Sequence, residues 1–447
     1  GLRGVVADPF GSSLCLILVG LLFAAPLYRR KLLTIGDYFR QRYNRTVEVV
    51  ISLCIVVSYL GWVGAQIKAL GLVFNVVSDG SIAINVGMLI GAASILIYTL
   101  FGGMVSVAIT DLIQMLVIVA GMLYIGAEVS GQVGGVATVV QHASDAGKLA
   151  FWPGPNIVEI LGFFAAWITM MLGSIPQQDV FQRVMSSRTQ AIAVASSVLG
   201  GVLYFFFAFV PMFLAYSATL VDPKLVAQYI DTDSQQILPQ FIISHAPVAA
   251  QILFFGALLS AIKSCASATL LAPSVTFAEN IVKGFYPNLS DRRFLWVMRG
   301  TIVGFAGIVL VFALNSESSI FHMVESAYKI TLAGAFVPLV FGILWKRATT
   351  QGALAATFGG LLSWLLVEVL IVETPPEYAY ALIGAERVPP QLVGLGVSML
   401  GMLAGSLLPQ WVGHKTPGRP LHELQHHVAA ETHHVHEHHI EHGRHPG

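Results

Sequence analysis

Long apolar segments recur along the chain, and they constrain its fold more than any other feature. About eleven windows are long and apolar enough to cross a bilayer as α-helices, whose backbone hydrogen bonds all form within the segment. The windows lie near residues 8–29, 48–77, 82–100, 105–128, 158–180, 191–219, 246–282, 295–314, 320–345, 349–372 and 390–409. Only 11% of the residues are charged, against about 25% in soluble domains. We therefore predict an all-α polytopic membrane protein.

Positive charge gathers in every second loop between these windows. The basic loops carry Arg29, Arg30, Lys31, Arg40, Arg42 and Arg45; then Arg183 and Arg188; then Lys283, Arg292 and Arg293; then Lys346 and Arg347. Because basic loops stay in the cytoplasm, we expect a multi-pass protein of the cell (inner) membrane with a cytoplasmic C-terminus. The first window then runs from outside to inside. This start, together with Gly1 in place of methionine, predicts that at least one further helix precedes the chain.

The end of the chain differs in composition from the rest. Residues 411–447 are polar and rich in histidine, so we expect a disordered cytoplasmic tail after a transmembrane domain at residues 1–410. Histidine tracts suit transition metals, and a plain soluble tail is the alternative. Within the windows, Cys15, Cys54 and Cys265 show no metal-site or disulfide spacing. We expect no metal centre, no nucleic-acid partner and no enzyme, but a small-molecule solute and the lipid bilayer as partners. The oligomeric state is left open.

A lysine interrupts the seventh window. Lys263 lies among small hydroxyl and thiol residues in the segment Gly256–Pro273. A charge at mid-membrane costs a few kcal/mol or more and marks a functional site. At about 100° per residue, Ala261, Ser264 and Cys265 form a face that the Cβ of Lys263 does not cover. The lysine is therefore expected to reach toward an acid outside this face.

Asp111 is the first candidate for that acid, ahead of Asp179 and Glu325. It lies about two turns into the fourth window. A structural partner to a cation and a coupling-ion ligand are both open roles for it. We predict that the Lys263 nitrogen lies closer to Asp111 than to any other acid.

Pro176 predicts a break in the fifth window. Proline removes a backbone donor and clashes with the preceding turn, and discontinuous helices build transporter sites near the membrane midplane. Trp167 and Met171, nine and five residues earlier, are candidates for the wall of a small-solute pocket. Arg183 is expected to be only the cytoplasmic end of the helix. A site role and a structural role are both open for Gln177, Gln178 and Asp179.

Four segments carry recognisable motifs. They are Thr34–Tyr43 (TIGDYFRQRY), Gly102–Gln114 (GGMVSVAITDLIQ), Gly173–Ser186 (GSIPQQDVFQRVMS) and Pro338–Ala353 (PLVFGILWKR, then GA). In this order and spacing they resemble motifs of the sodium:solute symporter family, which includes proline, pantothenate, glucose and high-affinity choline transporters. The resemblance covers residues 1 to about 410.

The resemblance implies a leucine-transporter-type inverted repeat of five plus five core helices. On this basis the chain holds core helices two to ten and two extra helices, and it lacks the first core helix. In the family that helix supplies part of both the sodium and the substrate site. We therefore expect the chain, as given, not to transport.

The resemblance also implies positions for the two sites. The sodium site maps onto the Ala261 carbonyl, Ser264 and Cys265, with Asp111 at an ion-coupling position. Cys265 departs from the family's usual serine or threonine, and Lys263 replaces an apolar neighbour; a thiol is a poor ligand for a hard cation. The substrate wall maps onto Trp167, Met171, Gln177, Asp179, Tyr204, Asp8 and Ser12.

The leading hypothesis is sodium-coupled symport of a small organic solute by alternating access, with no cofactor besides the coupling ion. A second hypothesis is a proton-coupled or sodium-independent transporter in which Lys263 replaces the ion. A third is a membrane domain that senses a solute without moving it. The substrate itself is left open by the sequence.

Overall fold

The computed structural model describes residues 1–101, 104–373 and 388–412, and all regular secondary structure in these ranges is helical. Ten helical segments there are long and apolar enough to span a membrane, or up to eleven with the bent pair α8–α9. The ten are Leu2–Tyr28 (η1 to α2), Arg45–Val77 (α4), Ile84–Phe101 (α5), Ile109–Gln132 (in α6), Gln190–Val221 (α10–α11), Val248–Phe285 (α14–α15), Asp291–Asn315 (α16), Ile320–Leu344 (α17–α18), Thr350–Leu370 (in α19) and Pro390–Leu407 (α21). The predicted all-α polytopic class is confirmed.

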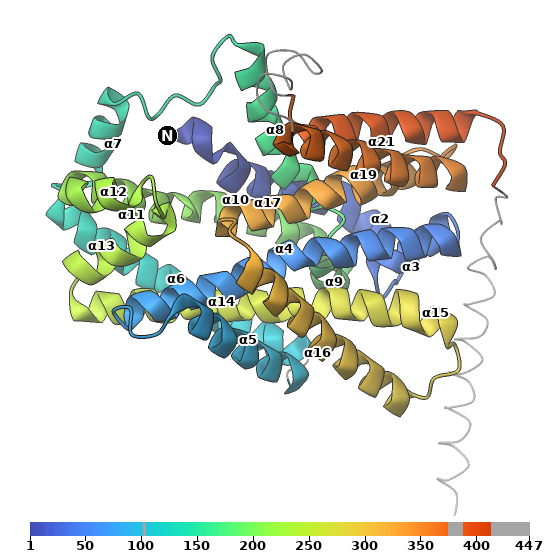
Figure 1. Ribbon diagram of the computed structural model, residues 1–447, viewed down its shortest axis with the longest axis horizontal. Coiled ribbons are helices and arrows are strands. Elements are labelled where there is room, and N and C mark those ends of the chain that lie inside the picture. Colours follow the sequence, from blue (N-terminus) through green and yellow to red (C-terminus); the bar gives the residue numbers. More distant parts are fainter. Residues whose placement is uncertain (102–103, 374–387, 413–447) are drawn as a thin grey trace, which may run out of the picture.

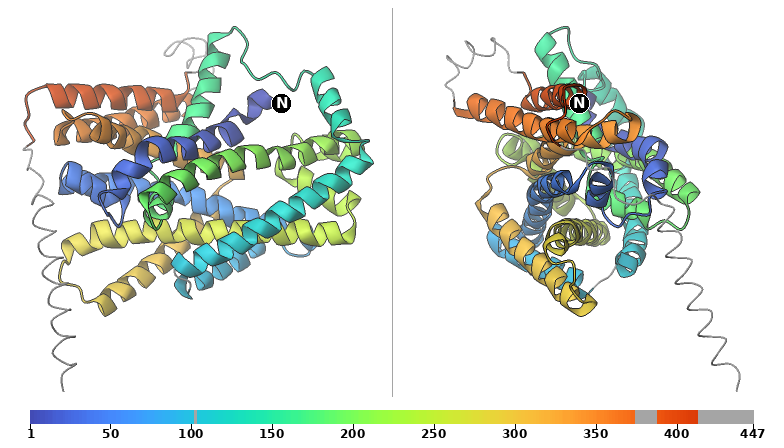
Figure 2. Two further views of the ribbon diagram at one scale, coloured as in Figure 1. Left: turned by 180° about the vertical axis from the view of Figure 1, so that it is seen from behind. Right: turned by 90° about the vertical axis from the view of Figure 1, so that its right-hand side faces the viewer.

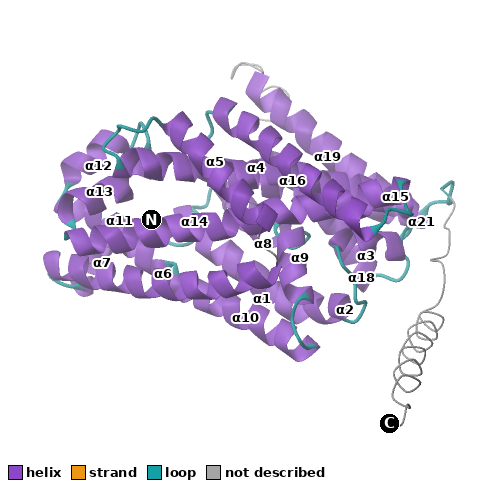
Figure 3. Cartoon of the chain, turned by 90° about the horizontal axis from the view of Figure 1, so that it is seen from below, coloured by secondary structure: helices purple, strands orange, loops and turns teal. Residues whose placement is uncertain are grey.

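The spans lie side by side along the long axis of the molecule, and shorter helices cover its two ends (Figures 1 and 2). α3 (Ile35–Arg42) and α15 (Lys283–Phe285) lie at one end, while α7 (Val136–Asp145), α12 (Pro223–Tyr229) and α13 (Ile237–His245) lie at the other. Figure 3 shows α18 (Val337–Leu344) at the same end as α3. The loops at this end are those rich in arginine and lysine, and we call it the basic end.

α4 forms the centre of the bundle. Its apolar window is 67% buried, the largest share among the candidate spans of the described chain. α14 (Val248–Thr276) and α17 (Ile320–Thr331) both pack against it. Gly61 permits the approach of α17, because a Cβ atom there would lie 2.4 Å from the Met323 carbonyl oxygen. α4 therefore positions side chains from opposite sides of the bundle.

Two spans are interrupted inside the bundle. α8 (Ile157–Gly173) and α9 (Gln178–Met185) meet at an angle of 44° across residues 174–177. The helix break predicted at Pro176 is therefore present. The first span is also irregular, because Asp8 has the non-helical angles φ −141° and ψ 117° within η2 (Val6–Gly11). Both interruptions leave polar groups inside an otherwise apolar bundle.

α3 ties several helices together at the basic end. Thr34 and Asp37 close a capping box at its start, which pairs amide donors that the first helical turn leaves free. The backbone N–H of Ile35 donates to Gln178 Oε1 of α9 at 2.8 Å. Asn280, which follows α14 and is fully buried, donates to Asp37 at 3.0 Å and to Glu48 of α4 at 2.9 Å. The first of the four sequence motifs thus serves as a structural junction.

The last two spans, α19 (Thr350–Glu373) and α21 (Pro390–Leu407), pack against each other at one side of the bundle (Figure 1). The sequence predicts that two helices in this part of the chain lie beyond the inverted repeats. The Gly102-Gly103 pair that begins the second motif lies outside the described residues. So do the histidines of the predicted tail at 411–447, of which only Trp411 and Val412 are described.

Candidate functional site

A partly open cavity of about 610 Å³ lies between the first span, α4, the α8–α9 break, α10 (Gln190–Phe207) and α17. This volume is in the range of small-molecule sites. Its lining residues are Asp8, Ser12, Cys15, Leu16, Trp62, Met170, Ser174, Val180, Tyr204, Gln235, Ile320, Phe321, Val324 and Tyr328. Three of the predicted substrate residues, Asp8, Ser12 and Tyr204, are among them.

Asp8 is the charged group of this cavity. Its Oδ1 atom accepts a hydrogen bond from the Tyr204 hydroxyl of α10 at 2.6 Å. Ser12 follows one turn later, at the start of α1 (Ser12–Leu18), and lines the same space. The irregular backbone at Asp8 therefore places a carboxylate, fixed by a phenol, inside the membrane-spanning bundle.

Aromatic rings form much of the remaining wall. Trp62 of α4 and Tyr328 of α17 are neighbours, with ring centroids 5.7 Å apart. Met170 lines the cavity, whereas the predicted Met171 does not. Trp167 also lies outside the lining and stacks on Phe164, with centroids 6.1 Å apart. Of the α8 side chains, the structure therefore brings Met170 to this cavity and leaves the predicted Trp167 and Met171 outside it.

A second polar cluster joins α6 (Met104–Gln132), α9 and α14. The Ser264 hydroxyl of α14 donates a hydrogen bond to Asp111 of α6. Arg183 of α9 lies between two carboxylates, 3.9 Å from Asp111 Oδ2 and 3.4 Å from Asp179 Oδ2. The Tyr59 hydroxyl of α4 donates to Asp179 Oδ1 at 2.5 Å. This cluster thus connects the predicted ion position to the second half of the broken helix.

Lys263 does not form the expected ion pair with Asp111. Its ammonium lies over the Tyr98 ring of α5, 5.1 Å from the centroid. The partner of Asp111 is Arg183, whose guanidinium approaches from a different helix. The physical reason is the helical arc: Ser264 and Lys263 are consecutive, so their side chains leave α14 about 100° apart. The other two predicted ligands, Ala261 and Cys265, are half-buried on α14.

Gln177 has a packing role in this structure. Its side-chain amide donates to Ser58 at 3.2 Å and to Thr331 at 3.3 Å, and only 2% of its surface is exposed. Thr331 donates in turn to the carbonyl of Gly173. These bonds hold the broken segment between α4 and α17. Gln177 does not line the cavity at Asp8.

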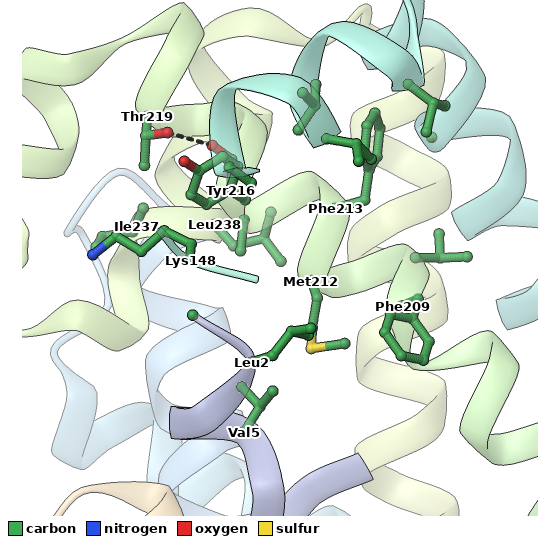
Figure 4. A pocket seen from close by; sticks show the side chains of 18 of the residues that line it. Leu2, Val5, Lys148, Phe209, Met212, Phe213, Tyr216, Thr219, Ile237 and Leu238 are labelled. Atoms are coloured by element: carbon green, nitrogen blue, oxygen red, sulfur yellow. Dashed lines mark hydrogen bonds between the residues drawn. The ribbon is translucent and has the colours of Figure 1, made fainter. Parts of the chain in front are cut away.

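A larger cavity of about 810 Å³ lies toward the opposite end of the molecule (Figure 4). Leu2, Val5, Phe209, Met212 and Phe213 are among the apolar side chains that line it. It contains none of the predicted site residues, and its walls offer little polar chemistry for recognising a solute. The smaller cavity at Asp8 is therefore the candidate site.

Trp62, Tyr59 and Arg183 are among the residues of these clusters that were not predicted from the sequence. Trp62 and Tyr59 belong to α4, a helix that no motif singled out. Arg183 was assigned only to a helix end, although it stands two residues beyond Phe181 in the QR pair of the third motif. The position of Arg183 close to the predicted helix break could have marked it as a candidate site residue, because charged residues near discontinuous helices often take part in transport. Among the described residues, no group of three His, Cys, Asp or Glu side chains is arranged to hold a metal ion.

An all-helical bundle with a discontinuous helix beside a solute-sized cavity is the architecture of a secondary transporter. The particular family is shown by sequence: the model of the sodium:solute symporter family matches residues 1–360, and the chain belongs to this family. A solved Na+-coupled sialic acid symporter, in a substrate-bound outward-open state, has the same fold. The TM-score is 0.70 at 19% identity, over 91% of this chain and 86% of that one. The expected leucine-transporter-type fold is thereby confirmed.

Curated relatives are similar to the chain over most of its length. The high affinity choline transporter 1 of Homo sapiens is 29% identical over 372 residues, which cover 79% of this chain and 61% of that protein. The osmoregulated proline transporter OpuE of Bacillus subtilis is 25% identical over 356 residues, covering 75% of this chain and 68% of the relative. The sodium/proline symporter of Escherichia coli is 25% identical over 354 residues, covering 75% and 67%. The chain thus spans less than two thirds of the choline transporter's length.

Proposed function

We propose that the protein carries out sodium-coupled symport of a small organic solute by alternating access, without covalent chemistry. The observation that supports this proposal is that one helix connects the cavity at Asp8 with the polar cluster around Asp111. The broken α8–α9 helix lines the solute cavity through Met170, Ser174 and Val180. Its second half also contacts the Asp111 cluster through Arg183. A movement of α9 would therefore act on both sites.

The Asp111 cluster supplies suitable ligands for sodium. A carboxylate and a hydroxyl from two helices, Asp111 and Ser264, already touch each other. Hard cations prefer such oxygen ligands. The Ala261 carbonyl, one turn before Ser264, is proposed as a further ligand, while the Cys265 thiol contributes poorly. A sodium ion would compete with Arg183 for Asp111, and this competition would free α9.

The membrane orientation follows from the charges at the two ends. We propose that the basic end faces the cytoplasm, by the positive-inside rule, and that the protein resides in the cell membrane. The C-terminus is then cytoplasmic, after a transmembrane domain at residues 1–410. Solute would enter from the end that carries α7, α12 and α13.

The test is uptake by the full-length protein in proteoliposomes, with and without an inward sodium gradient. The names of the relatives suggest a panel that contains choline and proline. We expect Asp111→Asn to lower sodium-driven uptake at least about tenfold, since each 1.4 kcal/mol lost in ion binding costs a factor of ten. Asp145→Asn is the matched control, because Asp145 is exposed on α7 and bonds only locally to Gln141. Equal uptake by both variants would contradict the sodium role of Asp111.

Lys263 supports a second candidate, a sodium-independent transporter in which a fixed ammonium replaces the ion. The supporting observation is that Lys263 lies next to Ser264 in sequence and is held by the Tyr98 ring. In that case uptake would be equal with and without sodium, and Lys263→Met would abolish it. Uptake that requires sodium and survives Lys263→Met would exclude this candidate.

A further inference from the structure

We propose that the cavity at Asp8 takes a small organic cation, an amine that is methylated or protonated. This inference names the substrate class of the transporter proposed above and rests on that proposal for transport, although binding is tested separately. It depends on three features of the cavity: an uncompensated carboxylate, a set of aromatic rings and two occupied helix N-termini.

The carboxylate of Asp8 lacks a counter-charge. No described residue forms an ion pair with Asp8, and its hydrogen-bond partner is the neutral hydroxyl of Tyr204 at 2.6 Å. Among the described residues that line the cavity there is no lysine, arginine or histidine. Asp8 is an exposed residue that lines the cavity, so a solute can reach its carboxylate, and opposite charges attract at such short range. A bound cation would supply the missing charge.

The aromatic rings favour an organic cation over a metal ion. Trp62, Tyr204, Phe321 and Tyr328 all line the cavity. The faces of such rings attract cations within about 6 Å, and aromatic cages are a common means of binding quaternary ammonium groups. A bare metal ion would occupy only a small part of about 610 Å³. An ammonium that carries alkyl groups matches both the charge and the apolar walls.

Two helix N-termini border the cavity, and neither favours the carboxylate of an anionic or zwitterionic solute. α9 carries Asp179 in its first turn, and the Asp179 N–H donates to the Tyr59 hydroxyl at 2.9 Å. At the start of α17, the Ile320 N–H donates to Gln235 Oε1 at 2.8 Å. Helix N-termini bind anions through free N–H groups. Here these two donors are occupied, so a solute with a single positive charge is preferred.

The experiment compares three probes of similar shape and different charge. Tetramethylammonium, tert-butanol and pivalate are each titrated into the purified protein in lipid nanodiscs by calorimetry. We expect tetramethylammonium to bind at least about tenfold more tightly than the other two, a difference of about 1.4 kcal/mol. Equal affinities, or a preference for pivalate, would overturn the inference.

Three variants identify the groups responsible. Asp8→Asn keeps an acceptor for Tyr204 and is expected to remove the preference for the cation. Phe321→Leu tests the cage at a ring that is 46% exposed, where loss of folding is not expected, and should weaken tetramethylammonium binding alone. Asp145→Asn is the control and should bind as the native protein does. A cation preference that survives Asp8→Asn would refute the role of the carboxylate.

The outcome also separates this inference from the proposed function. Selective binding of tetramethylammonium, without sodium-driven uptake of any solute in the panel, would uphold the cation site and reject symport. Sodium-driven uptake of a neutral or anionic solute, without binding of tetramethylammonium, would reject the cation site and uphold symport.

Discussion

The hydroxyl of Tyr59 is the clearest point at which to test the polar cluster around α9. Tyr59 is fully buried on α4. Its hydroxyl donates to Asp179 Oδ1 at 2.5 Å and accepts the Asp179 backbone N–H at 2.9 Å. Tyr59→Phe removes both bonds and keeps the ring, so it creates no large cavity. The substitution therefore isolates the hydrogen bonds that hold the start of α9 against the central helix.

The expected loss can be estimated from these two bonds. A hydrogen bond to a charged group contributes about 1.5–3 kcal/mol, and a buried donor left unpaired costs about 1–3 kcal/mol. Inside membranes, side-chain bonds contribute less, up to about 1.7 kcal/mol. We therefore expect Tyr59→Phe to lower the free energy of unfolding by about 2 kcal/mol. Sodium-driven uptake should fall with it, because Asp179 and Arg183 lose their fixed position.

The assay is unfolding in mixed micelles by titration with sodium dodecyl sulfate, followed by tryptophan fluorescence. Tyr28→Phe is the matched control. Its hydroxyl donates to the Ser187 carbonyl at 2.9 Å in a partly buried site, and a neutral bond of this kind contributes about 1 kcal/mol. A loss in Tyr59→Phe no larger than in Tyr28→Phe would refute the reasoning. If the reasoning holds, the double variant Tyr59→Phe, Asp179→Asn should lose less free energy of unfolding than the sum of the two single variants, as expected for side chains in contact.

Two further predictions concern the basic end. Gly36→Ala should destabilise the protein, because the new Cβ atom would lie 2.4 Å from the buried Asn280 Cγ. The control is Gly256→Ala, whose new Cβ atom meets no other atom within 4 Å. The control should leave the unfolding midpoint unchanged or raise it slightly. An equal effect of both substitutions would contradict the close packing of α3. Burial raises the pKa of Tyr38 and of Tyr43 above the usual value. Above about pH 10 these two tyrosines therefore stay protonated in the folded state but lose their protons in the unfolded state. The free energy of unfolding should fall there by up to about 1.4 kcal/mol per pH unit for each tyrosine. Unfolding titrations at pH 8–11 measure this slope, and Tyr43→Phe should reduce it.

The sequence by itself determined the class of the fold. An apolar window of membrane-spanning length forms an α-helix because the helix satisfies all of the segment's backbone hydrogen bonds internally. This outcome depends only on the local composition. Pro176 likewise predicted the break between α8 and α9, because a proline acts on its own turn. The capping box of Thr34 and Asp37 at the start of α3 is likewise a local interaction.

The tertiary structure decided which of these residues meet. A shift of one residue turns a helix by about 100°, and for this reason Met170 rather than Met171 lines the cavity. Tyr59 and Asp179 are 120 residues apart in sequence, and no local pattern joins them.

Two cations of the helical bundle, Lys263 and Arg183, show the same division. Lys263 is conspicuous in the sequence, yet it lies over Tyr98, outside the expected ion pair. Arg183 is inconspicuous at a helix end, yet it pairs with both Asp111 and Asp179. The sequence fixes which charges must find partners inside the membrane, because an unpaired charge there is costly. The choice of partner depends on how helices from distant parts of the chain pack around α4, and only the folded structure contains that information.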